Sequence, residues 1–274
     1  MLVDFHSHTN SSDGTYTAAE LAAAIKSRRV EIFSVTDHDA LGAYDVLRPH
    51  GVDVEELAPA KLVSGVEINT TYRGNEVHVL GYGFELGTTE LREVIEQNRR
   101  SRSERAQTMV DQLRRAGHDV TIEMVRAEGT ENAPLGRPHV AKALVRRGIT
   151  PSVEAAFRDF LTPGRPGYVP SHHISPHDAI GVVARSGGVP VLAHPGRLKD
   201  ERLIDEMAEA GLVGLEVFYP AHTNADIARY REIASRYGLV MSAGSDFHDP
   251  RWNARGVGME VAEDDIRPFL DLVL

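Results

Sequence analysis

Cysteine is absent from the 274 residues of this sequence, and its absence excludes several classes of protein. Disulfide-stabilised folds, thiolate metal sites and cysteine nucleophiles cannot be built from this chain. Long apolar runs are also missing, and Met1 leads straight into a strand-like segment rather than a signal peptide. We therefore expect a cytoplasmic protein with no membrane partner, and no obligate protein partner is evident from the sequence.

Basic residues are too few for a protein that coats nucleic acid. The 30 Lys and Arg residues stand against 40 Asp and Glu residues, which gives a formal net charge of −10. Only residues 89–170 are slightly basic, with 14 basic and 11 acidic side chains. Such a segment beside an acidic body could gather an anionic substrate, or it could be a set of solvated Arg-rich helices.

The sequence does contain a pair of histidines at the end of its first strand-like stretch. Side chains of a strand alternate between two faces, so His6 and His8 leave the same face, and Asp13 can bend back toward them from a Ser/Asp/Gly turn. Imidazole nitrogens and carboxylate oxygens suit Zn, Mn or Fe(II). Alone, the fragment indicates a metal site no better than it indicates two surface histidines.

The same arrangement recurs along the chain, in strand-like runs over residues 31–36, 61–68, 75–82, 189–194, 212–219 and 239–244. With the first stretch these runs make seven strands, and helical segments between them predict an α/β fold with a parallel (β/α) barrel whose site lies at one rim. Nine metal-compatible side chains lie near the strand ends: His6, His8, Asp13, His38, Glu67, His78, His194, Asp246 and His248. They are too many for one four-coordinate ion and fit two or three ions that share a bridging carboxylate.

Between residues 89 and 170 the alternation of strands and helices is interrupted. Apolar side chains at helical spacing predict a helix over 91–116, a second from Arg137 to about residue 148, and a third over 152–161. A Pro- and Gly-rich loop follows as far as Pro170. We therefore expect a metal-binding barrel formed by residues 1–88 and 171–274, with residues 89–170 inserted as a helical subdomain that covers the active site.

Six motifs match those of a known superfamily in order, spacing and residue type: Asp4-Phe-His-Ser-His8, Thr36-Asp-His-Asp39, Gly65-Val-Glu67, His78, Ala193-His-Pro195 and Ser245-Asp-Phe-His248. In these motifs the chain closely resembles the PHP superfamily (polymerase and histidinol phosphatase). The resemblance implies a distorted seven-stranded (β/α) barrel with three divalent ions at its rim, and a site of histidines and carboxylates accepts Mn, Fe or Zn.

The resemblance also implies how the nine side chains divide among the ions. His6, His8, Glu67 and Asp246 would hold one ion, Glu67 would bridge to a second held by His78 and His194, and Asp13, His38 and His248 would hold the third. Closely spaced ions lower the pKa of a bridging water. A hydroxide held by Glu67, His78 and His194 is therefore the expected nucleophile, acting on a phosphoester without a covalent enzyme intermediate.

Within the superfamily the chain is most similar to the nucleoside 3',5'-bisphosphate phosphatases, some of which also trim short RNA from the 5' end. This narrower resemblance rests on Gly136-Arg-Pro-His139, Gly167-Tyr-Val-Pro170 and His194-Pro-Gly-Arg197. It implies a small phosphorylated substrate, either a nucleotide or a short RNA end. Because arginine forks suit phosphate, the expected contacts are Arg137 and Arg197, with His139 and His222 as further contacts or leaving-group acids and Tyr168, Tyr219 or Phe247 as a ring for a base.

Three alternatives stay open. The chain could be a histidinol-phosphate phosphatase, although the helical insertion and Arg137-Pro-His139 weigh against it. It could be a non-catalytic metal-binding module, although no polymerase sequence is attached and no ligand has been lost. An amidohydrolase on another metal barrel fits the order of the motifs poorly.

Overall fold

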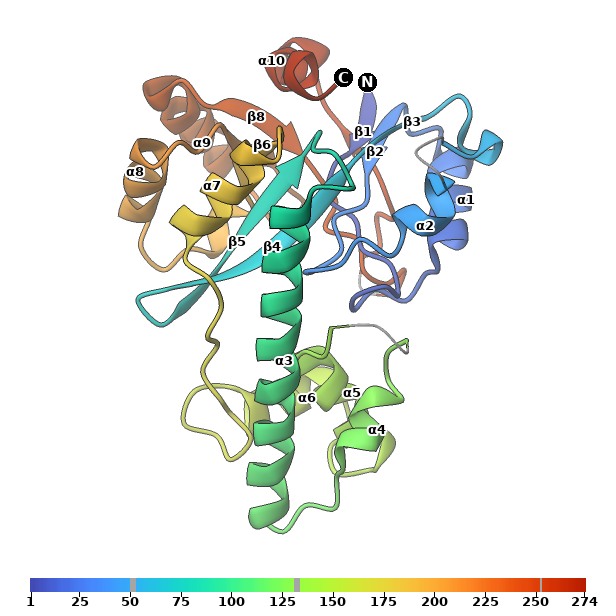
Figure 1. Ribbon diagram of the computed structural model, residues 1–274, viewed down its shortest axis with the longest axis vertical. Helices are drawn as coiled ribbons and strands as arrows, with labels where there is room; N and C mark the ends of the chain where they lie inside the picture. The colour runs from blue at the N-terminus through green and yellow to red at the C-terminus, as the bar shows by residue number, and fades with distance from the viewer. Residues whose placement is uncertain (50–52, 131–133, 252) are drawn as a thin grey trace.

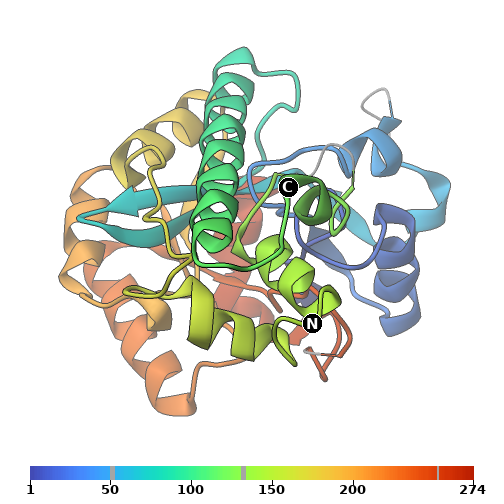
Figure 2. The ribbon, with the colours of Figure 1, turned by 90° about the horizontal axis from the view of Figure 1, so that it is seen from below.

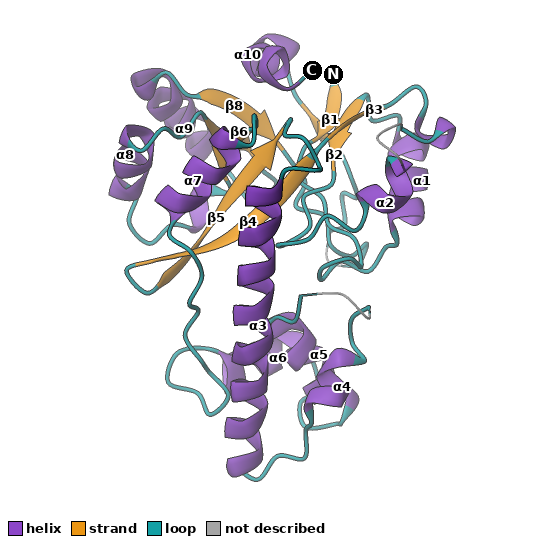
Figure 3. Ribbon diagram, in the orientation of Figure 1, coloured by secondary structure: helices purple, strands orange, loops and turns teal. Residues whose placement is uncertain are grey.

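The computed structural model describes residues 1–49, 53–130, 134–251 and 253–274. Over these residues the chain has the mixed α/β fold that the sequence predicts, with strands at the centre and helices around them (Figure 1, Figure 3). The strands are β1 (Leu2–Asp4), β2 (Ile32–Ser34), β3 (Lys61–Val63), β4 (Gly65–Tyr72), β5 (Asn75–Tyr82), β6 (Val189–Leu192), β7 (Gly214–Phe218), β8 (Val240–Ala243) and β9 (Met259–Glu260). They form two sheets.

The first sheet has the order β3-β2-β1-β9. β1, β2 and β3 run parallel, and the short β9 pairs antiparallel to β1 through Leu2 and Glu260. β2 is buried on both faces, as parallel strands covered by helices usually are. β1 therefore lies inside the sheet, between β2 and β9.

The second sheet has the order β4-β5-β6-β7-β8. β4 and β5 form an antiparallel hairpin that turns at Arg73 and Gly74, where φ is +48° and +76°. Positive φ at both central residues is typical of the two-residue turn that matches the twist of the strands. β5 is also antiparallel to β6, while β6, β7 and β8 run parallel. The expectation of a wholly parallel barrel is therefore wrong, because a two-residue turn joins only antiparallel strands.

The two sheets adjoin at their ends, and neither is closed. Phe5 N–H donates to Ala243 O at 2.9 Å and His8 N–H donates to Phe247 O at 2.8 Å, so the chain beyond β1 follows the chain beyond β8. On the other side, an isolated bridge pairs His38 with the Glu67 backbone. The described residues form nine strands and not the seven expected, because the predicted third strand divides at Ser64 into β3 and β4, and β9 is too short to show a pattern.

Helices cover the outer faces of both sheets (Figure 1). α1 (Ala18–Arg28) and α2 (Tyr44–Leu47) pack on the first sheet; α7 (Pro176–Arg185), α8 (Arg202–Glu209), α9 (Asn224–Tyr237) and α10 (Glu263–Val273) pack on the second and around the chain ends. α1 begins at a capping box, where Glu20 N–H donates to Thr17 Oγ1 at 3.2 Å and Thr17 N–H donates to Glu20 Oε2 at 2.7 Å. Among the described residues, no helix is long and apolar enough to cross a membrane.

The segment between β5 and α7 is helical and extends away from the sheets (Figure 1). α3 (Thr89–Arg115) is 27 residues long, and its far half packs with α4 (Ile122–Arg126), α5 (Arg137–Arg146), α6 (Val153–Ala156) and the π-helical turn η3 (Phe157–Leu161). These helices share an apolar core of their own that includes Leu113, Val140 and Leu144. Viewed from below, the helices lie in front of one end of the sheets (Figure 2).

Gly244 marks a close approach between the two sheets. A Cβ atom there would lie 2.1 Å from His6 Cβ and 2.8 Å from Glu216 Oε1, which is far inside van der Waals contact. We predict that Gly244→Ala lowers the free energy of unfolding by about 3 kcal/mol, as overpacking does. Gly87→Ala is the matched control, because a Cβ there meets nothing within 4 Å. Urea unfolding curves of both variants test this, and equal stability of the two would contradict it.

Candidate metal centre

The nine predicted ligands come together where the two sheets adjoin. Each lies in a strand or in the loop that follows one: His6, His8 and Asp13 after β1, His38 after β2, Glu67 in β4, His78 in β5, His194 after β6, and Asp246 and His248 after β8. The most exposed side chain among them is that of His248, at 20%. Neighbouring rings of the six histidines have centroids 3.9–6.1 Å apart. The fold therefore brings together residues that lie far apart in the sequence.

The Glu67 carboxylate lies at the middle of this cluster, and its two oxygens face different histidines. Oε1 is 2.7 Å from His78 Nδ1 and 3.2 Å from His194 Nε2. Oε2 is 3.1 Å from His38 Nδ1 and 3.2 Å from Nε2 of both His6 and His8. A carboxylate placed between two groups of ligands in this way has the geometry of a bridging ligand.

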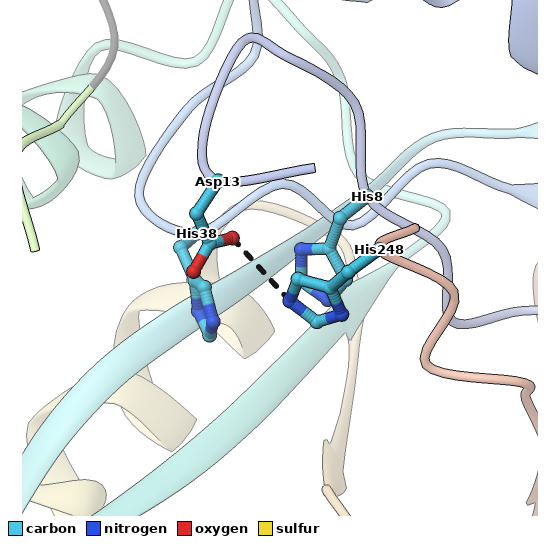
Figure 4. Close-up of side chains that lie close together, drawn as sticks. All are labelled: His8, Asp13, His38 and His248. Carbon is cyan, nitrogen blue, oxygen red and sulfur yellow. Dashed lines mark ion pairs between the residues drawn. The ribbon is translucent and has the colours of Figure 1, made fainter. Parts of the chain in front are cut away.

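Ligand atoms within 4.8 Å of one another define three groups in the described part of the chain. They are His6, His8, Glu67 and Asp246; His8, Asp13, His38 and His248; and His38, Glu67 and His78. The first is the set that the sequence analysis assigned to one ion. Figure 4 shows the second, in which Asp13 Oδ1 faces His248 Nε2 at 3.3 Å with His8 and His38 beside them. His8 and His38 each belong to two groups, so the sharing of ligands differs in detail from the expected division.

Buried polar atoms without hydrogen bonds indicate that these side chains fit a metal. Both ring nitrogens of His8 and Oδ1 of Asp13 are buried and form no hydrogen bond of normal geometry. His8 Nε2 nevertheless lies 3.2 Å from Glu67 Oε2 and 3.3 Å from Asp246 Oδ1. Buried polar atoms are nearly always satisfied, and histidine nitrogens that converge with carboxylate oxygens suit a divalent transition metal.

The charges of the cluster support the same conclusion. Burial alone would raise the pKa of the Glu67 carboxyl, but His38, His6 and other imidazoles outweigh it and hold this pKa well below its usual range. His6 responds in the opposite direction: burial would lower its pKa, but Glu216 and Glu67 raise it well above the usual value. Protons and cations therefore compete for the same nitrogens, and metal binding would release protons.

The backbone bends sharply at two of the candidate ligands. His194 has φ of +29° and Asp246 has φ of +51°, which is the left-handed region that non-glycine residues rarely adopt. His194 lies two residues after β6 and Asp246 lies three residues after β8, so each bend turns the chain where it leaves a strand. Such strain is concentrated at functional sites, where the surrounding structure holds it in place.

Relatives that match nearly the whole chain are known. The chain is 33% identical to the 3',5'-nucleoside bisphosphate phosphatase of Chromobacterium violaceum, over 93% of this chain and 90% of that protein. It is 33% identical to the phosphoribosyl 1,2-cyclic phosphate 1,2-diphosphodiesterase of Eggerthella lenta, over 95% of this chain and 99% of that protein. It is 31% identical to the 5'-3' exoribonuclease Rnm of Escherichia coli, over 91% of this chain and 86% of that protein. No family profile matches the chain.

Two solved structures have the same fold. A protein from Bifidobacterium adolescentis that is described as a metal-dependent phosphoesterase superposes with a TM-score of 0.86 at 30% identity, over 99% of this chain and 96% of that one. The chain belongs to the PHP metal-dependent phosphoesterases. An amidohydrolase from Chromobacterium violaceum, with bound sulfate and no metal, superposes with a TM-score of 0.88 at 30% identity, over 99% of this chain and 97% of that one. The PHP phosphoesterase described here is accordingly a hydrolase.

One functional residue of this PHP phosphoesterase is missing from the sequence analysis. Glu216 in β7 is fully buried; its Oε1 accepts from His6 Nδ1 at 2.8 Å, and its Oε2 accepts from His194 N–H at 2.6 Å. It thereby fixes the ring of one candidate ligand and the backbone of another. The signal in the sequence was a single charged residue inside the apolar run Leu215-Glu-Val-Phe218.

A second buried network connects the helical segment to the cluster. The Asp39 carboxylate, next to His38 in the chain, accepts from Asn98 Nδ2 at 2.8 Å and from Arg102 Nη1 at 3.4 Å, both on α3. Arg102 Nε also donates to Leu135 O at 3.1 Å, just before α5. All these side chains are less than a tenth exposed. The turn that carries His38 and the start of α5 are therefore held by the same arginine.

The two predicted phosphate-binding arginines of the phosphoesterase lie beside the cluster. Arg197 Nη2 is 3.2 Å from Asp246 Oδ2, and its guanidinium lies 5.3 Å from the centroid of the Tyr219 ring. Its side chain remains 59% exposed and so is accessible to a ligand. Arg137, at the start of α5, forms an ion pair with Glu76 of β5. Burial would raise the pKa of Glu76, but Arg137 and Arg105 outweigh it and hold this pKa at about 2.

The two predicted histidine contacts have other partners in the structure. His139 is 1% exposed; its Nδ1 accepts from Gly136 N–H at 3.1 Å, and burial lowers its pKa to about 4. Its ring is therefore neutral at neutral pH, and the one N–H that it keeps is too weak an acid to protonate a leaving group. His222 lies with Nδ1 2.9 Å from Val217 O, while its Nε2 accepts from Gly196 N–H at 3.3 Å. That contact supports the turn before Arg197.

We predict that Glu216→Gln lowers manganese affinity or turnover by about 10–100-fold, because an amide cannot accept on both sides as the carboxylate does. Glu232→Gln on the exposed face of α9 is the control. Bound manganese after gel filtration and phosphate release are measured on both variants. Wild-type metal content together with wild-type turnover in Glu216→Gln would show that this carboxylate positions nothing.

The pairing of Glu76 predicts a pH effect on stability. The carboxyl has an ordinary pKa of 4.5 and a folded pKa of about 2, so between these values only the unfolded chain binds the proton. The stabilisation is fully present above pH 4.5 and is lost as the pH falls toward 2. The difference in unfolding free energy between wild type and Glu76→Gln should therefore shrink from pH 5 to pH 2. Urea titrations at several pH values, with Glu260→Gln on β9 as control, would refute this if the difference stayed constant.

Proposed function

We propose that this PHP phosphoesterase hydrolyses the phosphomonoester of nucleoside 3',5'-bisphosphates and also trims short RNA in the 5'-to-3' direction. The observation that carries the proposal is the placement of Arg197, an accessible guanidinium 3.2 Å from Asp246 at the edge of the ligand cluster. A phosphate that reached the cluster would meet this fork, which suits its oxygens. The relatives named for nucleoside bisphosphates and for RNA support the choice of substrate.

In this proposal the cluster holds two or three divalent ions, of Mn, Fe or Zn. His6, His8, Glu67 and Asp246 hold one; Glu67, His78 and His194 hold the second; Asp13, His38 and His248 hold the third. What supports the number is that eight of the nine predicted ligands share three overlapping groups, more than one ion needs. The ninth, His194, lies outside these groups, with its Nε2 3.2 Å from Glu67 Oε1. What supports the choice of metals is that the donors are imidazoles and carboxylates without any thiolate.

When bound, such ions lower the pKa of a coordinated water and polarise phosphoryl oxygens. The chain contributes orientation around them. Glu67, His78 and His194 surround the place from which water attacks, and Arg197 holds the phosphate. Arg137 reaches the substrate from α5, while His139 and His222 act through the turns that they support.

The proposal also includes the architecture expected from the sequence. β1, β2 and β4 to β8 would form a distorted ring of seven strands, with the helices of residues 89–170 as an inserted subdomain over the site. The backbone links between residues 5–8 and 243–247, and between His38 and Glu67, support such a ring. The separate apolar core of α3 to η3 supports the subdomain.

One assay separates the candidate substrates. Phosphate release by the Mn-loaded protein is compared for adenosine 3',5'-bisphosphate, AMP, histidinol phosphate and a short 5'-phosphorylated RNA, and cleavage of phosphoribosyl 1,2-cyclic phosphate is followed alongside. We expect the bisphosphate to lead by ten-fold or more, about 1.4 kcal/mol in the barrier. A lead for the cyclic phosphate would favour the activity named for the Eggerthella lenta relative. A lead for histidinol phosphate would remove the nucleotide from the proposal.

We predict that His38→Ala lowers turnover of the preferred substrate by at least about 100-fold, because it removes a side chain that two ligand groups share. Circular dichroism should show the fold retained. The exposed His172 provides the control, His172→Ala. Normal turnover in purified, metal-loaded His38→Ala would rule out the proposed metal mechanism.

A further inference from the structure

A cavity of about 320 Å³ lies beside the metal cluster and has no assigned role. It is lined by the β4–β5 hairpin, by residues 163–171 after the helical segment, and by residues 197–206 after β6. Its volume falls at the lower end of the range for small-molecule sites, so it suits a fragment of nucleoside size. The cavity is thus formed where the β4–β5 hairpin of the second sheet, the helical segment and the turn after β6 approach one another.

Arg197 connects the cavity to the cluster. It lines the cavity on one side, and on the other it lines a cleft of about 310 Å³ whose walls include Asp13, Asp246 and His248. A molecule with one phosphate in the cleft would therefore pass this guanidinium and extend into the cavity. The two spaces together have the shape that a substrate with a reacting phosphate and a larger remainder requires.

The charge on the cavity wall is suited to a second phosphate. Glu76 is shared by Arg137 and Arg105, at 3.0 Å from Arg105 Nη1, so these three side chains keep one positive charge in surplus. Asp200 is paired with Arg202 at 2.7 Å. Lys199, by contrast, is exposed and forms no hydrogen bond or ion pair with any residue that the structure describes. Unneutralised cations on one wall attract an anion.

One aromatic ring is available for a base. Tyr72 and Tyr168 both line the cavity. The guanidinium of Arg73 lies 4.8 Å from the centre of the Tyr72 ring, and the Tyr72 hydroxyl donates to Glu206, so this ring is already engaged. Tyr168 is half-buried and sits on a turn closed by its N–H and Arg165 O at 3.0 Å. A ring held by such a turn can stack on a base, which contributes about 1–3 kcal/mol.

We infer that this cavity binds the nucleoside and the phosphate that is not cleaved, with Tyr168 stacking on the base and Lys199 and Arg137 binding the second phosphate. The inference rests on the proposed function, because it takes the reacting phosphate to lie at the cluster with Arg197. It adds the reason for a preference for bisphosphates over simple phosphomonoesters: only a substrate with a base and a second phosphate uses the cavity.

The test measures how strongly adenosine 3',5'-bisphosphate competes with p-nitrophenyl phosphate, which has neither a base nor a second phosphate, for the Mn-loaded protein. We expect Lys199→Ala to raise the inhibition constant of the bisphosphate about ten-fold, or 1.4 kcal/mol, and Tyr168→Leu to raise it about five-fold. The kcat and KM for p-nitrophenyl phosphate should stay within two-fold of wild type in both. The controls are Lys61→Ala on β3 and Tyr237→Leu on α9, which remove the same groups far from the cavity.

An unchanged inhibition constant in both cavity variants would overturn the inference. An equal rise of the inhibition constant in the two control variants would also overturn it. The proposed function fails separately. The bisphosphate could compete with p-nitrophenyl phosphate, and the cavity variants could raise its inhibition constant as expected, while the wild-type protein releases no phosphate from the bisphosphate. In that case the cavity binds nucleotides, but bisphosphate hydrolysis is not the activity. A rise in KM for p-nitrophenyl phosphate in Lys199→Ala would place Lys199 at the reacting phosphate and also overturn the inference.

Discussion

The structure depends on one buried carboxylate, that of Glu67. It is 1% exposed and has five imidazoles around it. Removing a carboxylate from water costs several kcal/mol unless compensating charges surround it, so the strands that bring those histidines must arrive in register. β4 carries Glu67 in the second sheet, whereas His6, His8 and His38 come from the first. The cluster and the junction of the two sheets are therefore one feature, and the close contact at Gly244 and the buried Glu216 belong to it.

Much of this could be read from the sequence. Alternation along a strand brought His6 and His8 to one face, and metal-compatible residues near later strand ends indicated a shared site. The capping box at the start of α1 is local chemistry, because Thr17 and Glu20 stand at the required spacing in the sequence itself. The family followed from motif order, and the relatives confirm it. These successes have one cause, because each motif is a short run of residues and the order of the motifs is read directly from the sequence.

Most of what the sequence did not reveal depends on contacts across long separations, and one hairpin was missed for a local reason. The His6–Glu216 pair spans 210 residues and the Asp39–Arg102 pair spans 63, and no spacing rule connects such positions. The antiparallel β4–β5 pair was missed because the turn at Arg73 and Gly74 is short and was not recognised as a hairpin turn. His139 and His222 stood in suitable motifs, but their nitrogens bond to backbone groups that only the folded chain brings near. Arg105, which shares Glu76 with Arg137, was hidden in an Arg-rich helix for the same reason.

The position of β1 has a consequence for the order of events in the cell. The residues after β1 bond to residues 243–247, more than 230 positions later, and β1 itself pairs with β9. Contacts of such high sequence separation form late and slow folding. Residues 5–8 therefore cannot make these bonds until residues 243–247 have been synthesised, and His6 and His8 meet Asp246 only then. The complete set of candidate ligands is accordingly available to ions only after residues 246–248 have left the ribosome.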